Sequence, residues 1–244
     1  SSRELISARI FGHAPAGKAP VPAKIESRSF AADDPELVVG LIFLEGPQIL
    51  VDNQAQTLDV PAPGTLLVMD REQQDELANQ GQNQNQDRAN TGEITGFTWQ
   101  GDMHLDRALG TARIRKQVQV RQENIATGNE VALNTDQLDA RFDIGQSGAI
   151  TDGIQTQGTR LLGADAIGSV RFRYEGRELL ADSTSYDAIS NSLFASAVGS
   201  KLVTLYDDTQ PGPMSAKTMR WDLEKDRIEI NAPTPSRTIG QPTD

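Results

Sequence analysis

Apolar and polar side chains alternate every second residue in several strand-length segments of this chain. In ARIRKQVQV, Ile114, Val118 and Val120 share one parity, while arginine and glutamine take most of the other. In GSVRFRYEG, Val170 and Phe172 share one parity in the same way. A period of two is typical of β-strands that bury one face and expose the other. The pattern therefore predicts strands, each contributing one face to an apolar core.

Similar segments follow one another at spacings of about ten residues, separated by turn-forming Asp, Asn, Gly and Pro. After residue 92 no segment has the 3.6-residue period of an amphipathic helix. Short strands in close succession favour antiparallel meander connections. We therefore predict an all-β fold, an elongated twisted stack of antiparallel hairpins.

Composition divides the chain into three parts, the second of which is interrupted by a polar segment. Residues 1–36 include FGHAPAGKAPVPAK and indicate an extended lead-in, and residues 37–230 form the predicted β domain. Within that domain, residues 71–92 are rich in Gln and Asn. We interpret them as a long solvated loop, with a binding element as the alternative. Residues 231–244 are rich in Pro and indicate a C-terminal tail.

Charge and cysteine content exclude several classes of function. The formal net charge of −11 leaves no basic patch for nucleic acid and disfavours docking on an anionic membrane surface. The absence of Cys excludes disulfides, thiol catalysis and Cys-based zinc sites. Hydrophobic residues make up 37% and aromatic residues 5%, which suits a thin aliphatic core in an elongated β structure.

The longest apolar segment, LVVGLIFL, has the length of a strand and not that of a membrane-spanning helix. The first residues, SSRELISARIFGH, lack Met and the features of a signal peptide. We expect a mature or excised fragment that does not span a membrane, with any targeting segment outside it.

Two stretches of the chain echo each other. ADSTSYDAISNSLFA (181–195) and AKTMRWDLEKDRIEI (216–230) both begin with Ala, and Tyr186-Asp187 aligns with Trp221-Asp222. Leu193 then aligns with Ile228, and LNTDQLDARFD is a third, degenerate version. We interpret the aromatic residue as the last inward residue of a strand and the Asp as the start of a turn. The echo indicates either a true structural repeat or a chance likeness within a β meander.

The same stretches resemble the OstA-like repeat of lipopolysaccharide-transport proteins of the LptA/LptC type. The matching elements are Gly168 to Val170, Leu179 to Asp187, Leu193 to Gly199 and Ala216 to Asp222. The resemblance covers roughly residues 103–230. It implies a partly open β jelly roll, or β-taco, with an apolar trough that holds the acyl chains of lipopolysaccharide or a related glycolipid.

The resemblance also implies a periplasmic or cell-envelope location and assembly with other transport modules. Unpaired sheet edges allow such assembly, because their backbone groups can pair with another strand. No cofactor and no metal are implied.

Parity marks twelve inward residues as candidates for lining a lipid trough. They are Ile114, Val118, Val120, Leu133, Val170, Phe172, Tyr174, Tyr186, Leu193, Met219, Trp221 and Ile228. An open trough and an ordinary closed core require the same alternation, so both interpretations remain open at this stage.

A search for catalytic groups finds little. His13 and His104 are the only histidines, and no P-loop, G-x-S-x-G or G-x-G-x-x-G motif is present. Acid pairs such as Asp33-Asp34 and Asp207-Asp208 are typical of turns. A β-solenoid polysaccharide enzyme with carboxylate catalysis is conceivable, but no residues locate its site.

Two main hypotheses follow. The first is a non-enzymatic envelope module that binds lipid in an apolar trough. The second is a structural or protein-interaction β scaffold with a closed core and no lipid transfer.

Overall fold

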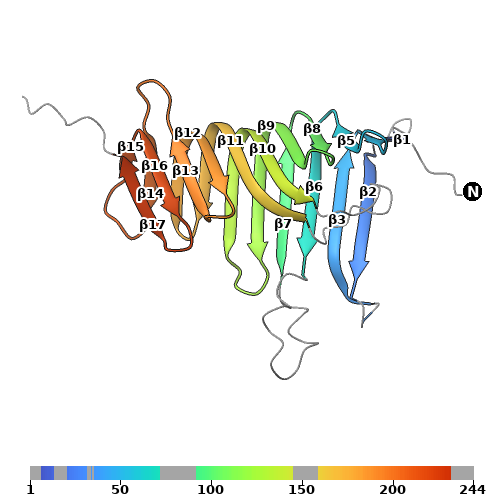
Figure 1. The fold of residues 1–244 in the computed structure, drawn as a ribbon, viewed down its shortest axis with the longest axis horizontal. Helices are drawn as coiled ribbons and strands as arrows, with labels where there is room; N and C mark the ends of the chain where they lie inside the picture. Colours follow the sequence, from blue (N-terminus) through green and yellow to red (C-terminus); the bar gives the residue numbers. More distant parts are fainter. Residues whose placement is uncertain are drawn as a thin grey trace, which may run out of the picture.

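The computed structural model describes residues 7–13, 21–31, 34, 36–71, 92–144 and 159–231. Seventeen strands and the turns between them make up this part of the chain, and it contains no helix. Figure 1 shows the strands side by side along the long axis, from β1 and β2 at one end to β14–β17 at the other.

The strands in the first half of the chain are mostly short, whereas those near its middle are long. The first eight are β1 (Ser7–Phe11), β2 (Ala23–Phe30), β3 (Val38–Gly46), β4 (Gln48–Asp52), β5 (Thr57–Val60), β6 (Gly64–Asp70), β7 (Glu93–Trp99) and β8 (Met103–Asp106). The long strands are β9 (Thr111–Asn124), β10 (Glu130–Ile144), β11 (Thr159–Tyr174) and β12 (Arg177–Asp187). The last five are β13 (Ser192–Ser196), β14 (Val203–Asp207), β15 (Met214–Ala216), β16 (Thr218–Asp222) and β17 (Arg227–Asn231).

Every pairing between these strands is antiparallel, and the long strands show how the sheet is organised. One end of β9 pairs with β8 and the other end pairs with β7. In the same way, the two ends of β12 pair with β13 and β14. The sheet therefore consists of two halves, and the long strands run through both.

We call these halves half-sheet A and half-sheet B. Half-sheet A pairs β1, β4, β5, β8, the first part of β9, the last part of β10, the first part of β11, the last part of β12, β13, β16 and β17. Half-sheet B pairs β2, β3, β6, β7, the other parts of β9–β12, β14 and β15.

The line between the half-sheets, which we call the crease, interrupts the register of every long strand. The pairing of β9 with β10 skips residues 116 and 117, and that of β11 with β12 skips residues 168 and 169. Among the shorter strands, Pro47 separates β3 from β4, and residues 61–63 separate β5 from β6. Bulges and prolines bend strands and interrupt ladders. The crease therefore lies at the same level in successive strands.

Backbone conformation at the crease is unusual. Lys116, Gln117, Gly168 and Ser169 all have positive φ. The buried hydroxyl of Thr135 lies 2.9 Å from the carbonyl oxygen of Ile167 in the neighbouring strand, within hydrogen-bond distance. A polar group buried at the bend is therefore satisfied by backbone oxygen.

The inward side chains of the two half-sheets pack together in two clusters. The N-terminal cluster is built around Ile49, Val60, Trp99 and Val118, and the C-terminal cluster around Leu179, Leu205, Met219 and Trp221. Leu133 and Ala181 pack against both clusters. No pairing joins β1 or β2 to β15 or β17 among the described residues, so this sheet is folded over and not closed. The predicted all-β, open β jelly roll (β-taco) is confirmed.

The lead-in prediction for residues 1–36 is corrected in part. Strands β1 and β2 lie within this segment and pair with β4 and β3. The sequence AKIESRSF alternates, and its inward Ala23 and Ile25 join the N-terminal cluster. The surrounding Ala and Pro residues obscured this short signal. The Gln/Asn-rich loop, apart from Arg71 and Gly92, and the tail from residue 232 onward lie outside the described residues.

Glycine at the crease provides a test of this architecture. Gly168 has φ of +83°, and an added Cβ would lie 2.9 Å from the Cβ of Asp136. Gly128 has φ of +68°, but an added Cβ there meets nothing within 4 Å. We expect Gly128→Ala to lower the free energy of unfolding by about 1 kcal/mol, because only its positive φ is unfavourable. Gly168→Ala should lower it by about 2–4 kcal/mol, because the added Cβ also meets Asp136. Urea unfolding of both variants measures the difference, and equal losses would contradict the close packing at the crease.

Candidate functional site: the apolar inner face

Half-sheet A carries an unbroken row of apolar residues on its inner face, each opposite the next across neighbouring strands. In spatial order the row is Ala8, Val51, Leu58, Leu105, Ala112, Ala140, Ala164, Tyr186, Leu193, Trp221 and Ile228. The last four are the residues that align in the two echoing stretches. The echo therefore corresponds to consecutive positions of one row.

Half-sheet B carries the facing row. It consists of Ile25, Leu44, Leu66, Phe97, Val120, Leu133, Phe172, Leu179, Leu205 and Met214. Large aliphatic and aromatic side chains fill the whole row. The inner face is thus apolar on both half-sheets from one end of the described sheet to the other.

Burial varies along these rows. Leu44 and Leu58 near the N-terminal end, and Leu179, Leu193 and Trp221 near the C-terminal end, are almost fully buried. Between them lies a half-buried stretch, which we call the middle section. It comprises Leu105, Ala112, Ala140, Ala164 and Tyr186 on half-sheet A and Leu66, Phe97, Val120 and Leu133 on half-sheet B.

Side-chain size accounts for the middle section. Three successive residues of the half-sheet A row, Ala112, Ala140 and Ala164, are alanine. The row residues on either side of them are the larger Leu105 and Tyr186. A methyl group does not reach far across the interior, so the side chains on half-sheet B keep part of their surface exposed. The middle section therefore keeps part of its apolar surface exposed.

All twelve sequence-predicted lining residues lie on the inner face. Ile114, Val118 and Val170 are buried in the N-terminal cluster, and Val120 and Leu133 pack against it. In the C-terminal cluster the buried members are Phe172, Leu193, Met219 and Trp221, and the residues packed against it are Tyr174, Tyr186 and Ile228. Of the twelve, Val120, Leu133 and Tyr186 belong to the middle section, and contact of any of them with lipid stays a prediction.

The sequence interpretation missed most of the middle section. Ala112, Ala140 and Ala164 were not selected, because alanine carries little hydrophobic signal by itself. Their parity with Ile114, Leu138 and Ala166 was the available signal. Phe97 follows Gly96 in a strand whose alternation is weak.

Two aspartates form the turns that directly follow the row residues Tyr186 and Trp221. Asp187 Oδ1 accepts hydrogen bonds from the backbone N–H groups of Ile189 and Ser190, at 2.8 and 3.0 Å. Asp222 Oδ1 accepts one from the N–H of Lys225 at 2.9 Å. These backbone donors lower the pKa of both carboxyl groups. The interpretation of both aspartates as turn formers is confirmed.

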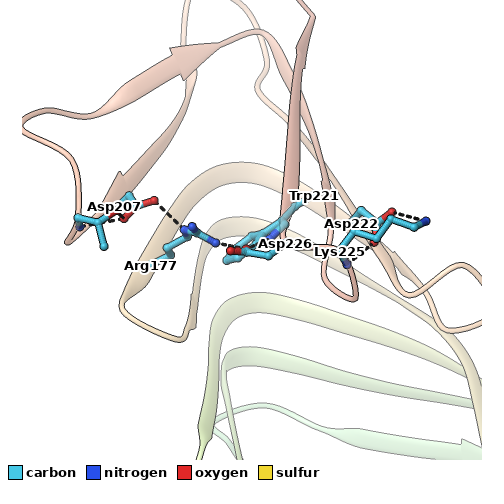
Figure 2. A network of polar contacts seen from close by, with 7 residues as sticks. Arg177, Asp207, Trp221, Asp222, Lys225 and Asp226 are labelled. Carbon is cyan, nitrogen blue, oxygen red and sulfur yellow. Dashed lines mark hydrogen bonds and ion pairs between the residues drawn. The ribbon is translucent and has the colours of Figure 1, made fainter.

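A polar network surrounds Trp221 at the C-terminal end of the inner face (Figure 2). Arg177 Nε donates a hydrogen bond to Asp207 Oδ2 at 2.8 Å, and Arg177 Nη1 pairs with Asp226 Oδ1. The guanidinium carbon of Arg177 lies 5.5 Å from the centre of the Trp221 ring. The Trp221 indole N–H donates to Asp226 Oδ1 at 3.3 Å.

Asp207 is held in its charged form. Its side chain is only 4% exposed, and hydrogen bonds from the Thr209 hydroxyl and the Arg177 guanidinium lower its pKa to about 2. Hydrogen bonds to the carboxylates of Asp207 and Asp226 raise the pKa of Arg177. The arrangement supplies an anchored ion pair and places no unpaired acid at the inner face.

The histidines do not adjoin the inner rows. His104 Nδ1 lies 2.6 Å from Asp59 Oδ1, and both residues have the parity that points outward from half-sheet A. His13 forms an isolated bridge with Val21. Within the described ranges, no group of three or more His, Asp or Glu residues is arranged to hold a metal ion.

A surface hollow of about 310 Å³ lies over β9–β12 on half-sheet B. Its walls are mainly charged and polar, including Arg121, Arg173, Glu130, Glu175 and Glu178. Glu178 pairs with two arginines of β11, which lowers its pKa. Opposite charges here satisfy one another in pairs such as Arg121 with Glu130 and Arg173 with Glu178.

The part of the chain that the structure describes forms no helix long and apolar enough to span a lipid bilayer.

No protein-family model matches this chain, and no curated protein matches it. Among solved structures it is similar to LptH of Pseudomonas aeruginosa, described as the LptA homologous periplasmic component of the conserved lipopolysaccharide transport device. The two chains are 11% identical with a TM-score of 0.39, over 57% of this chain and 82% of LptH.

The lowered pKa of Asp207 predicts a specific acid sensitivity. Its folded-state pKa lies below the ordinary value of about 3.9, so the unfolded chain takes up a proton first as the pH falls. The stability that Asp207 contributes is fully present above about pH 4 and is lost as the pH falls towards about 2. We expect Asp207→Asn to lower the free energy of unfolding at neutral pH. Between pH 2 and 4, the number of protons that the chain takes up on unfolding should fall by up to one.

Urea unfolding at several pH values measures this dependence. The matched control is Asp208→Asn, which removes the exposed neighbouring carboxylate. Identical pH profiles for the two variants would show that the paired carboxylate is not responsible.

Proposed function

We propose that this chain is a non-enzymatic cell-envelope module of the lipopolysaccharide-transport kind. Its inner face binds the acyl chains of lipopolysaccharide or a related glycolipid, and its sheet edges pair with neighbouring modules. The observation that carries the proposal is the middle section, where apolar side chains of both half-sheets remain half-buried between two more deeply buried stretches.

The chemistry of the middle section suits acyl chains. Both faces are apolar, and each methylene that leaves water there contributes about 0.8 kcal/mol. The polar groups nearest to it on half-sheet B, such as Thr95 and Gln122, lie further from the crease than the apolar row. They are suited to contact the polar part of a lipid whose chains lie deeper.

The sheet edges suit assembly. Among the described residues, β1 and β2 pair on one side only, as do β15 and β17 at the other end. Each edge therefore presents backbone donors and acceptors to an incoming strand. The periplasm is the location that we propose, in keeping with the resemblance of the repeat.

The second candidate is a β scaffold that binds no lipid. It is favoured by the dense packing on both sides of the middle section, where Leu44, Leu58 and Leu179 are each 1% exposed. Mass spectrometry of lipid that co-purifies with the folded protein distinguishes the two. Finding no lipid, together with no binding of labelled lipopolysaccharide, would leave the scaffold as the function.

Filling the middle section tests the site directly. We expect Ala140→Phe to weaken binding of a fluorescent dodecanoyl probe about tenfold, because the ring occupies the space of about two methylene contacts. Fluorescence titration measures the affinity, and urea unfolding shows whether the variant folds. Ala126→Phe, in the exposed turn between β9 and β10, is the matched control. Equal affinities of the two variants would place the site elsewhere.

A further inference from the structure

Trp221 joins the two half-sheets at the C-terminal end. It belongs to β16 in half-sheet A, and its indole is 1% exposed. Its ring centroid lies 5.9 Å from that of Phe172 and 6.0 Å from that of Tyr174, both on half-sheet B. The indole therefore fills the interior between the half-sheets, one strand from the edge strand β17.

The Arg177–Asp226 ion pair links the two half-sheets beside the Trp221 ring. Arg177 is anchored in half-sheet B by Asp207, and its second contact, Asp226, lies in the turn between β16 and β17 of half-sheet A. Asp226 also accepts the indole N–H of Trp221. Figure 2 shows Arg177 between the two aspartates, with Trp221 beside Asp226.

The two contacts of Arg177 differ in strength. Asp207 is 4% exposed and is bonded by Thr209 as well, whereas the Asp226 side chain is 53% exposed. An ion pair with one partner in solvent is screened and contributes little net stability. The contact with Asp226 is therefore the one that breaks first, and it is the contact that joins the half-sheets.

We propose that Trp221 and the Arg177–Asp226 pair form a latch that closes the C-terminal end of the apolar interior. An acyl chain in the middle section then reaches the C-terminal edge only when the latch opens. This inference rests on the proposed function for its ligand, but the latch itself is a property of the folded chain. Release of the acyl chain towards a module paired at β17 would then require the latch to open.

Asp226→Asn tests the latch without removing any apolar side chain. The matched control is Glu224→Gln, which neutralises another exposed acid in the same turn. In a Trp99→Phe background, Trp221 is the only tryptophan, and acrylamide quenching reports its exposure. We expect Asp226→Asn to raise the quenching constant at least twofold and Glu224→Gln to leave it unchanged. Asp226→Glu, which keeps the charge, should restore the low value.

Hydrogen exchange in the chain with natural Trp99 gives a second measurement that does not depend on the folding of the Trp99 variant. We expect Asp226→Asn to speed exchange in residues 218–231 and to leave β3 and β6 unaffected. Unchanged quenching and unchanged exchange would overturn the latch.

The functional arm uses a fluorescent dodecanoyl probe and acceptor vesicles of phosphatidylcholine. We expect Asp226→Asn to transfer the bound probe about fivefold faster than the natural chain, and raised salt to speed the natural chain alone. Equal transfer rates would overturn the gating step. If no variant binds the probe, the proposed function fails, while quenching and exchange still decide whether the latch exists.

Discussion

The bend that every long strand makes at the crease is the constraint on which the rest of the structure depends. A single antiparallel sheet with one apolar face would leave that face in water. Because β9 to β12 all shift register at the same level, the sheet folds over and covers itself. Left-handed residues such as Lys116 and Gly168, and the prolines between shorter strands, supply the bend. The chain thereby builds a two-layer interior without a helix among its described residues.

Once the half-sheets face each other, the size of the inward side chains determines what each section does. Large neighbouring residues, such as Leu179 and Leu205 on half-sheet B, are each 1% exposed in the interior. The alanines of β9, β10 and β11 leave the facing aliphatic groups partly exposed. At the C-terminal end, Trp221 spans the distance between the layers. A uniform pattern of alternation thus produces a filled section, an open section and a closed end.

Polar groups take a structural part in this arrangement. Asp187 and Asp222 hold the turns that end the strands, and their backbone donors keep both carboxylates charged. Arg177 and Asp207 form a buried pair, which is costly to break because an isolated charge would remain. Asp187, Asp222 and Asp207 therefore serve turns and an ion pair.

Local periodicity was enough to predict the all-β class, the antiparallel meander and the inward parity of all twelve candidate residues. It was also enough to identify Asp222 as a turn former, because an Asp side chain bonds its own neighbouring backbone. These properties depend on residues a few positions apart. The sequence alone therefore determined which residues face inward and where many strands end.

Only the tertiary structure decided how the strands are folded over and what faces what. Asp-Asn at 52–53 begins a hairpin turn, whereas Pro61 to Pro63 carries the chain across the crease, and both are simply breaks in the sequence pattern. The open middle section depends on three alanines that meet only through long-range pairing. Arg177 and Asp226 lie 49 residues apart and meet because the half-sheets face each other. Side-chain alternation is a local property, but the space between two layers depends on the register of the whole sheet.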